Sequence, residues 1–292
     1  MTLILFAIIF SASLVICFKA FVKLEVNTFH AILVNYYIAA FTSYLFADKN
    51  VPIVITENWF KFSSALGLLF ILTFVATSIT AQKISVITSM IASKMSLVIP
   101  LSYAVIFIGE EMTVLKLTAI ILAMLGVVLT VIQPRNDAPK SKKRKSLWLV
   151  AAVFVGSGLV DSAFKYIETN FYGIVQPQLV MMVCYASAAV IGTFYLIITS
   201  LKTPLKITIR SLIAGILLGV LNYFSFIFVV EALHDPLLPS TIVFPLLNVG
   251  VLLVATFTAL LVFHERLRSI NYIGVVISIL SILLLALQNY VV

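Results

Sequence analysis

Long apolar segments, separated by short polar stretches, follow one another along the whole chain. A helix needs roughly 20 apolar residues to cross the hydrocarbon of a bilayer. The segments lack the alternation of barrel strands, and a helix satisfies every backbone group within lipid. The pattern therefore predicts an all-α, polytopic membrane protein with ten transmembrane helices, at residues 2–18, 28–47, 62–82, 85–108, 113–132, 147–166, 177–200, 208–230, 237–262 and 270–289.

The composition agrees with a membrane protein and leaves no stretch for a soluble domain. The chain is 62% hydrophobic and 10% charged, whereas a soluble domain carries about 25% charged residues. No polar stretch between the predicted spans exceeds 15 residues. The formal net charge of +8 does not indicate nucleic-acid binding, because the charges lie at the ends of the spans, where membrane proteins keep them.

Basic residues are unevenly divided between the two sides of the predicted membrane. If the spans alternate, 4 basic residues lie on the side of the termini and 14 on the other side, and five of the 14 belong to the run Lys140–Lys145. Cytoplasmic loops of membrane proteins carry an excess of Lys and Arg. We therefore expect the linker at residues 134–146 in the cytoplasm, in a multi-pass protein of the cell (inner) membrane, and both termini outside.

The second half of the chain partly repeats the first. Glu110 and Glu265 each close a long apolar span, and they lie 155 positions apart. Gln133 and Gln288, at the ends of the spans that follow, have the same separation. This spacing predicts that the two halves arose by duplication.

Two further echoes occur in chain order. Val15–Lys19 is similar to Asp161–Lys165, near the ends of spans one and six, and Gly67–Leu69 is similar to Gly215–Leu217, in spans three and eight. Together the matches predict two five-helix repeats with a basic linker between them, at residues 1–133, 134–146 and 147–292. An odd number of spans makes the repeats inverted, and inverted repeats place a substrate site near the bilayer midplane, served by alternating access.

This layout resembles the EamA-type members of the drug/metabolite transporter superfamily, in which span four or nine typically ends in a Gly-Glu-like turn before a Gly-containing final span. The corresponding residues here are Gly109, Glu110 and Gly126 in the first half, and His264, Glu265 and Gly274 in the second. The chain departs from the family at His264, where Gly is common, and in its predicted orientation, since family members usually keep both termini in the cytoplasm. The resemblance implies export of a small organic metabolite, and turns shaped by glutamates that bind backbone amides.

A lysine near the middle of span four is the first candidate for chemistry. Lys94 lies within Ala92–Ser96, and a charge at that depth is costly on a lipid-facing surface. We therefore expect it to face a cavity or a charged partner. It could bind an anionic group of a substrate or act in coupling, and a structural pair with an acid is the alternative.

Asp161 is the one acid inside a predicted span. Four residues before Lys165, it could form a local ion pair along the helix. The alternative is a cavity carboxylate that pairs with Lys94 or titrates in proton coupling.

Amide and hydroxyl side chains occur in several other spans. Such groups also hold membrane helices together at about 1 kcal/mol each, so packing is as good an interpretation as ligand contact for any one of them. As a set they indicate a moderately polar cavity. By the separation of 155, Ser93 lies opposite Asn248. The candidate substrate-binding residues, besides Lys94, are Ser93, Asn248, Asn222, Tyr36 and Tyr223.

Prolines interrupt the corresponding spans four and nine, at Pro100, Pro239 and Pro245. Proline lacks a backbone donor, and interrupted spans in matching halves indicate a transporter's binding site; a harmless kink is the alternative. The Gly215–Gly219 pair matches a close-contact pattern, which we expect to serve packing inside the bundle.

Motifs of other functions are missing from the sequence: no phosphate-binding glycine loop, metalloprotease motif or partnered nucleophile occurs, and the three histidines are scattered. We therefore expect no enzyme, cofactor or metal. The expected partners are the lipid bilayer, a small-molecule substrate and, if transport is coupled, protons, but no nucleic acid; the sequence leaves the oligomeric state open. The expected function is secondary active transport of a small polar, amino-acid-like metabolite, driven by its own gradient or by protons. The alternative is a proton-coupled exporter of hydrophobic cations or drugs, which Asp161 favours and Lys94 disfavours.

Overall fold

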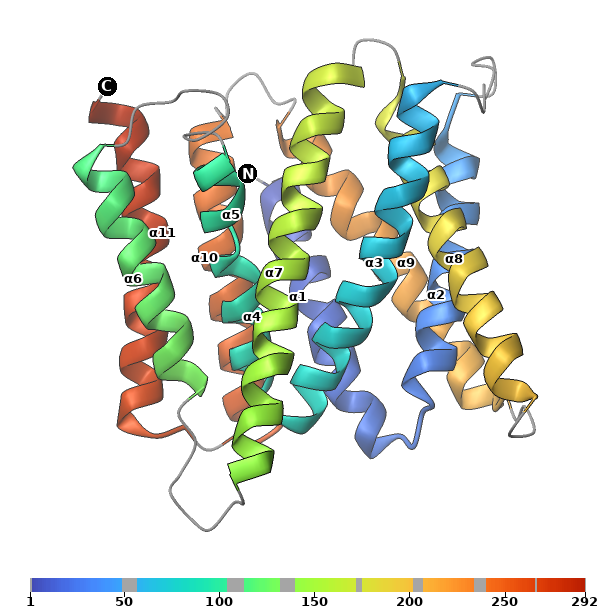
Figure 1. The fold of residues 1–292 in the computed structure, drawn as a ribbon, viewed down its shortest axis with the longest axis horizontal. Helices are drawn as coiled ribbons and strands as arrows, with labels where there is room; N and C mark the ends of the chain where they lie inside the picture. Colours follow the sequence, from blue (N-terminus) through green and yellow to red (C-terminus); the bar gives the residue numbers. More distant parts are fainter. Residues whose placement is uncertain are drawn as a thin grey trace. The chain divides into compact units, whose positions relative to one another are not determined.

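The computed structural model (Figure 1) consists of helices joined by short connections, and it describes residues 2–48, 57–103, 113–131, 140–171, 175–201, 207–233, 240–265 and 267–291. No strand occurs in these ranges, so the predicted all-α fold is confirmed for them. The helices are α1 (Thr2–Lys23), α2 (Thr28–Phe46), α3 (Asn58–Lys83), α4 (Val86–Met95), α5 (Val98–Tyr103), α6 (Val114–Val131), α7 (Lys140–Phe171), α8 (Pro177–Ser200), α9 (Ile209–Leu233), α10 (Ser240–Leu261) and α11 (Ser269–Val291).

Within the described residues, each predicted span lies on helix, and α1 and α7 continue about five residues past the predicted ends at 18 and 166. Two other differences are larger. Span four is divided into α4 and α5, and α7 begins at Lys140 instead of 147. Lys and Arg are good helix formers, so the second part of the basic linker continues the helix. Five of the helices, α1, α2, α3, α8 and most of α9, are long and apolar enough to cross a membrane by length and composition. These features support a helical membrane protein.

The helices form two compact units, and each unit takes parts from both halves of the sequence. Unit 1 comprises Met1–Lys19, Ala76–Gly158 and Phe224–Val292, and unit 2 comprises Ala20–Val75 and Leu159–Tyr223. The divisions fall within α1 and α7 and within α3 and α9, which correspond in the two predicted repeats. The units thus differ from the segments 1–133 and 147–292, and the duplication stays a prediction.

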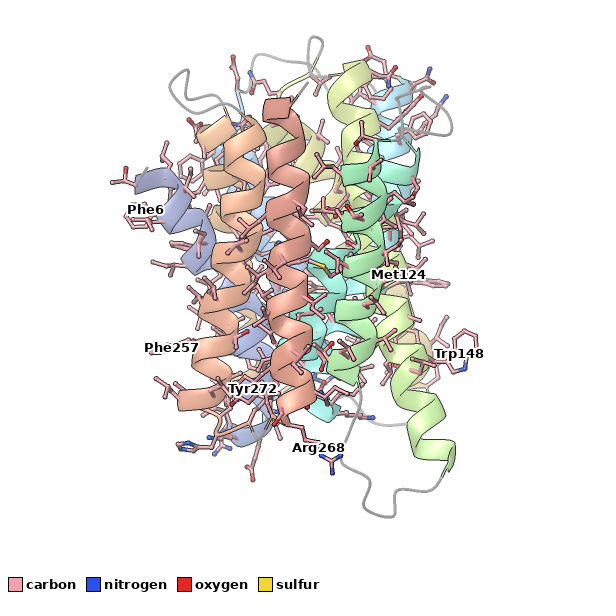
Figure 2. All side chains as sticks on the ribbon, turned by 90° about the vertical axis from the view of Figure 1, so that its left-hand side faces the viewer. Phe6, Met124, Trp148, Phe257, Arg268 and Tyr272 are labelled. Atoms are coloured by element: carbon pink, nitrogen blue, oxygen red, sulfur yellow. The ribbon has the colours of Figure 1, made fainter. Side chains whose placement is uncertain are left out.

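Large apolar side chains cover the outside of unit 1. Figure 2 shows Phe6, Met124 and Phe257 pointing away from their helices, and they are 49%, 46% and 67% exposed. Apolar surface of this extent is unusual on soluble monomers and marks contact with lipid or with a partner. Phe6 belongs to α1, which is long and apolar enough to cross a membrane, so lipid is the fitting environment for its side chain.

Aromatic and basic side chains gather toward one end of the same unit. Trp148 and Tyr272 are exposed and lie in the lower part of Figure 2, above Arg268. Trp and Tyr collect at membrane–water boundaries, and basic residues flank the spans. This end of unit 1 therefore has the composition of a membrane boundary.

In unit 2, α2 and α8 lie side by side and run in opposite directions (Figure 1). The hydroxyls of Tyr37 and Thr193 are 2.7 Å apart, in the middle of α2 and the second half of α8. Past the end of α2, the backbone N–H of Asp48 donates to the side-chain oxygen of Gln176, before the start of α8, at 3.0 Å. These contacts define an antiparallel pair.

Glycines let α3 and α9 approach this pair closely. A β-carbon at Gly67 of α3 would lie 2.6 Å from the carbonyl oxygen of Cys184 in α8. A β-carbon at Gly215 of α9 would lie 2.8 Å from the carbonyl oxygen of Ala31 in α2. Only a residue without a β-carbon fits such distances. The repeated glycine therefore marks equivalent contacts, and the Gly215–Gly219 pair packs helices within unit 2.

In unit 1, α6 and α11 form a second antiparallel pair (Figure 1). Gly126 and Gly274 face each other. A β-carbon at Gly126 would lie 3.2 Å from the carbonyl oxygen of Gly274, and one at Gly274 would lie 3.1 Å from that of Gly126. The hydroxyl of Ser281 donates to the carbonyl of Ala119 at 2.7 Å. α4 also packs on α10 in this unit. In both units, then, helices pair with the helices that correspond to them in the predicted repeat.

Candidate functional site

Span four is interrupted between α4 and α5, close to Lys94. In a continuous helix the carbonyl of Ser96 would accept the N–H of residue 100, but Pro100 has none. That carbonyl instead accepts the N–H of Ile99 at 2.9 Å. The break therefore has a local cause, and it lies where the proline predicts an interruption.

Lys94 lies near the middle of the predicted membrane. It is eight residues after Val86, the first residue of α4, which places it about 12 Å along the helix in a hydrocarbon layer of roughly 30 Å. Its side chain is half-buried. A cation at this depth, at the break of a helix, is suited to an anionic group.

Two other predicted residues, Ser93 and Asn248, belong to the same unit as Lys94. Ser93 precedes Lys94 in α4, and Asn248 lies on a helix that packs on α4. The hydroxyl of Ser157 in α7 donates to the hydroxyl of Ser93 at 3.1 Å. Asn248 is buried in α10, the helix that packs on α4. Unit 1 therefore holds Lys94, Ser93 and Asn248 of the predicted set.

At one end of unit 1, the carboxylate of Glu265 binds the N-terminus of α4. It accepts the backbone N–H of Val86 at 3.1 Å and the hydroxyl of Ser85 at 2.7 Å. Lys19 of α1 pairs with it at 3.1 Å. The resemblance implies that this glutamate shapes its own turn by binding nearby backbone amides; the amide that it binds is instead that of Val86 in α4, 179 positions away. Glu110 lies outside the described residues.

The residue before Glu265 has an unusual backbone. His264 has φ of 51°, in the left-handed region that glycine adopts most easily. The EamA-type pattern often has Gly at this position. The turn therefore needs a left-handed residue, and histidine tolerates it better than most side chains.

Unit 2 contains an amide pair between two helices, in which Asn35 is buried and Asn222 half-buried. The side-chain amides of Asn35 in α2 and Asn222 in α9 are 3.1 Å apart, and that of Asn35 also reaches the carbonyl of Leu218 at 3.1 Å. The hydroxyl of Tyr185 in α8 lies 3.5 Å from the amide oxygen of Asn222. Such pairs hold helices together in lipid. The contacts of Asn222 are those of a helix-packing residue, and its substrate role stays a prediction.

The two candidate tyrosines are surrounded by aromatic rings of unit 2. The ring of Tyr36 lies 5.8 Å from that of Phe74 and 6.1 Å from that of Tyr185. Tyr223 stacks on Phe46 with the ring centroids 5.4 Å apart. Both tyrosines are almost fully buried, so in this structure they pack, and their role in orienting a solute stays a prediction.

The remaining candidates lie partly outside the described side chains. Asp161 is half-buried in α7 and belongs to unit 2. Pro239 lies outside the described residues, as do the side chains of Pro100 and Pro245 and of Lys165, the predicted partner of Asp161. The backbone of Pro245 continues α10, so the ion pair and the interruption of span nine stay predictions.

The sequence-based candidates did not include several contacting residues. Ser157, Tyr185 and Lys19 bind residues distant in the chain, so no local pattern indicated them. Ser85 had a visible signal, because a serine before an apolar helix is a common N-cap. Its hydroxyl accepts N–H groups of the first turn of α4.

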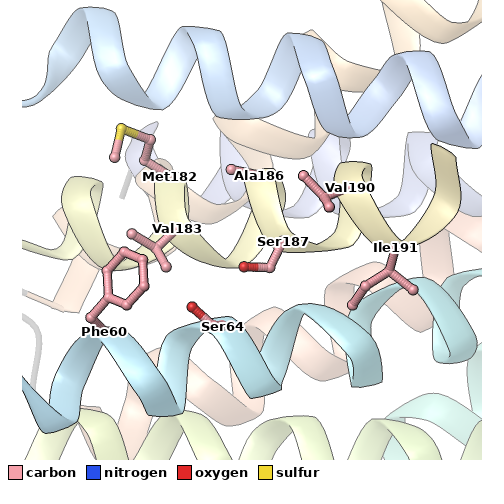
Figure 3. Close-up of a pocket in the computed structure, with 8 residues that line it drawn as sticks. All are labelled: Phe60, Ser64, Met182, Val183, Ala186, Ser187, Val190 and Ile191. Carbon is pink, nitrogen blue, oxygen red and sulfur yellow. The ribbon is translucent and has the colours of Figure 1, made fainter. Parts of the chain in front are cut away.

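A groove of about 680 Å³ lies between α3 and α8 in unit 2 (Figure 3). It is lined by Phe60, Ser64, Met182, Val183, Ala186, Ser187, Val190 and Ile191. None of these belongs to the predicted set, and Val190 on its rim is 65% exposed. Its apolar walls fit hydrocarbon better than a polar solute. Among the described residues, no group of three or more His, Cys, Asp or Glu could hold a metal ion.

Comparisons with known proteins support the fold. No protein-family model matches the chain. The chain is 28% identical over 242 residues to an uncharacterized protein of Haemophilus influenzae, covering 83% of this chain and 77% of that protein. A crystal structure of another protein superposes with a TM-score of 0.60 at 11% identity, over 97% of this chain and 98% of the other. The chain therefore shares its fold with a solved structure along nearly its whole length.

Proposed function

We propose that the protein is a secondary active transporter that moves a small polar, amino-acid-like metabolite across the cell (inner) membrane by alternating access. The observation that carries the proposal is the discontinuous helix α4/α5 with Lys94 beside its break. Secondary transporters build their substrate and ion sites from discontinuous helices near the midplane. In this proposal Lys94 neutralises an anionic group of the solute.

Helix pairing supports the inverted-repeat part of the proposal. α2 pairs with α8, α4 with α10 and α6 with α11, and in each case the partners correspond in the two predicted repeats. An inverted repeat makes corresponding helices antiparallel, as α2 with α8 and α6 with α11 are. The ten transmembrane helices, the EamA-type family and the direction of export belong to this proposal.

The proposed orientation follows from the basic start of α7. Within unit 1, this start lies at the opposite end from the last residues of α11 (Figure 1), as alternating spans require. The excess of Lys and Arg then puts the start of α7 in the cytoplasm and the C-terminus outside. Asp161 is the candidate for coupling to protons.

The test is uptake by the purified protein in proteoliposomes, with a panel of labelled amino acids, other polar metabolites and one quaternary ammonium compound. Wild type is compared with Lys94→Met and with Lys83→Met, which removes an exposed lysine of the same unit at the end of α3. A hydrogen bond to a charged group contributes about 1.5–3 kcal/mol, so Lys94→Met should lower uptake of an anionic or zwitterionic solute by at least about tenfold. Lys83→Met should transport like wild type.

Two results would overturn this proposal. Transport by Lys94→Met at the wild-type rate would remove Lys94 from the mechanism. Uptake of the quaternary ammonium compound alone, from the whole panel, would replace the metabolite carrier with the exporter of hydrophobic cations.

A further inference from the structure

The carboxylate of Glu265 joins three separate elements at one end of unit 1. One oxygen pairs with Lys19 of α1 and accepts the N–H of Val86 in α4, both at 3.1 Å. The other accepts the hydroxyl of Ser85, just before α4, at 2.7 Å. Glu265 itself lies in the connection from α10 to α11. A single acid thus fastens α1 and α4 to that connection.

The charges of this cluster are balanced and largely shielded from water. The side chains of Lys19 and Glu265 are only 22% and 10% exposed. The N-terminus of a helix carries a partial positive charge that favours a nearby anion. Next to Lys19, the side-chain amide of Gln82 at the end of α3 donates to the carbonyl of Phe18 at 2.9 Å. Removal of the negative charge would therefore loosen several elements at once.

A polar face of α4 leads from this cluster toward Lys94. Ser85, Ser89 and Ser93 follow at intervals of four residues, and residues so spaced share one face of a helix. Ser89 is fully buried, and its hydroxyl donates to the carbonyl of Thr77 in α3 at 3.1 Å. The Glu265 cluster therefore closes the end of the helix face that carries Ser89 and Ser93, one residue before Lys94.

We propose that the Lys19–Glu265 pair is a charge-dependent lock that closes this end of unit 1, and that its release admits water to the polar face of α4. The inference rests on the proposed transport function, which requires a closure that opens and shuts. If the ion pair had a structural role alone, it would stabilise the fold but would not control the access of water to Ser89.

The residue types of the lock recur in the other half of the sequence. Ser240 follows Ser85 by 155 positions, and Glu110 precedes Glu265 by the same number. Lys165 ends the segment that is similar to the segment ending at Lys19. Their side chains lie outside the described part of the structure. Alternating access requires a closure on each side of the membrane, and the sequence carries the same residue types twice.

The test measures access to a cysteine placed just inside the lock. Ser89→Cys is introduced into a chain whose own cysteines carry Cys17→Ala and Cys184→Ala, and its reaction with a small charged methanethiosulfonate is timed in proteoliposomes. Glu265→Gln should raise the labelling rate by about tenfold or more, since loss of about 1.4 kcal/mol shifts an equilibrium tenfold. Lys19→Met should raise it less, because the carboxylate keeps its bonds to α4.

The matched control is Glu25→Gln, which makes the same chemical change in an exposed ion pair. Glu25 lies 3.0 Å from Arg210, and their side chains are 81% and 63% exposed. This variant should leave the labelling rate unchanged. The double variant Lys19→Met/Glu265→Gln should label no faster than Glu265→Gln alone, because both changes release one lock.

A second reporter separates local release from general unfolding. Cys184 is fully buried in unit 2. In a Cys17→Ala variant that keeps both Ser89 and Cys184, Glu265→Gln should leave the labelling of Cys184 slow. Equal labelling of Ser89→Cys with and without Glu265→Gln, or faster labelling of Cys184 as well, would overturn the lock. The labelling needs no substrate, so failure of the transport assay and failure of the lock can be told apart.

Discussion

Substitution of Gly67 by alanine tests the close approach of α3 to α8. The new β-carbon would lie 2.6 Å from the carbonyl oxygen of Cys184 and 2.9 Å from the backbone nitrogen of Ala188. Both are backbone atoms, so α3 must move away from α8 by several tenths of an ångström to restore normal contact. Overpacking of this kind costs typically about 1–3 kcal/mol. Because these clashing atoms belong to the backbone, we take the upper part of that range, about 2–3 kcal/mol.

The better helix propensity of alanine offsets part of this cost. Alanine stabilises a helix interior by about 1 kcal/mol relative to glycine, so the net loss should be about 1–2 kcal/mol. At about 2–4 °C for each kcal/mol, we expect Gly67→Ala to lower the melting temperature by about 2–8 °C.

The assay follows unfolding in detergent with a dye that fluoresces on reaction with a thiol. Cys184 is buried at this helix contact, and a Cys17→Ala background makes it the reporter. Gly250→Ala is the matched control, because the three atoms nearest to its β-carbon would all belong to the side chain of Ile8, which can rotate away. A wild-type melting temperature for Gly67→Ala, or an equal fall for Gly250→Ala, would refute the reasoning.

Two further substitutions test local features by the same melting assay. His264→Gly should keep or slightly raise the melting temperature, whereas His264→Val should destabilise by about 1–2 kcal/mol, since a β-branched residue is strained at a φ of 51°; equal stability of the two would contradict the left-handed turn. Asn35→Ala and Asn222→Ala should each cost about 1 kcal/mol, and the double variant should cost less than their sum because they share one contact; strict additivity would refute the pair.

The positions of the helices could be predicted because apolar segments of membrane length are visible in the sequence. The break beside Lys94 could be predicted as well, since Pro100 removes the donor that a continuous helix needs. The start of α7 at Lys140 could not, because hydropathy locates the apolar part of a helix and not its polar extension.

The partners of the polar residues were beyond sequence reasoning. Asn35 and Asn222 are 187 positions apart and meet because Gly219 lets α9 approach α2. A polar residue inside a span indicates a polar neighbour, but a solute and another helix satisfy it equally well. For the same reason, the sequence could predict that Glu265 binds backbone amides near a turn. Its contacts with Val86 and Lys19 could be found only from the folded structure.

The central claim is that the protein carries a solute by alternating access through a site at Lys94. The most direct measurement is counterflow in proteoliposomes, in which an excess of unlabelled solute inside exchanges for a labelled trace outside. We predict that internal solute accelerates entry of the label in wild type and Lys83→Met, and that Lys94→Met loses the acceleration. Entry that is independent of internal solute, or that Lys94→Met retains in full, would contradict the account.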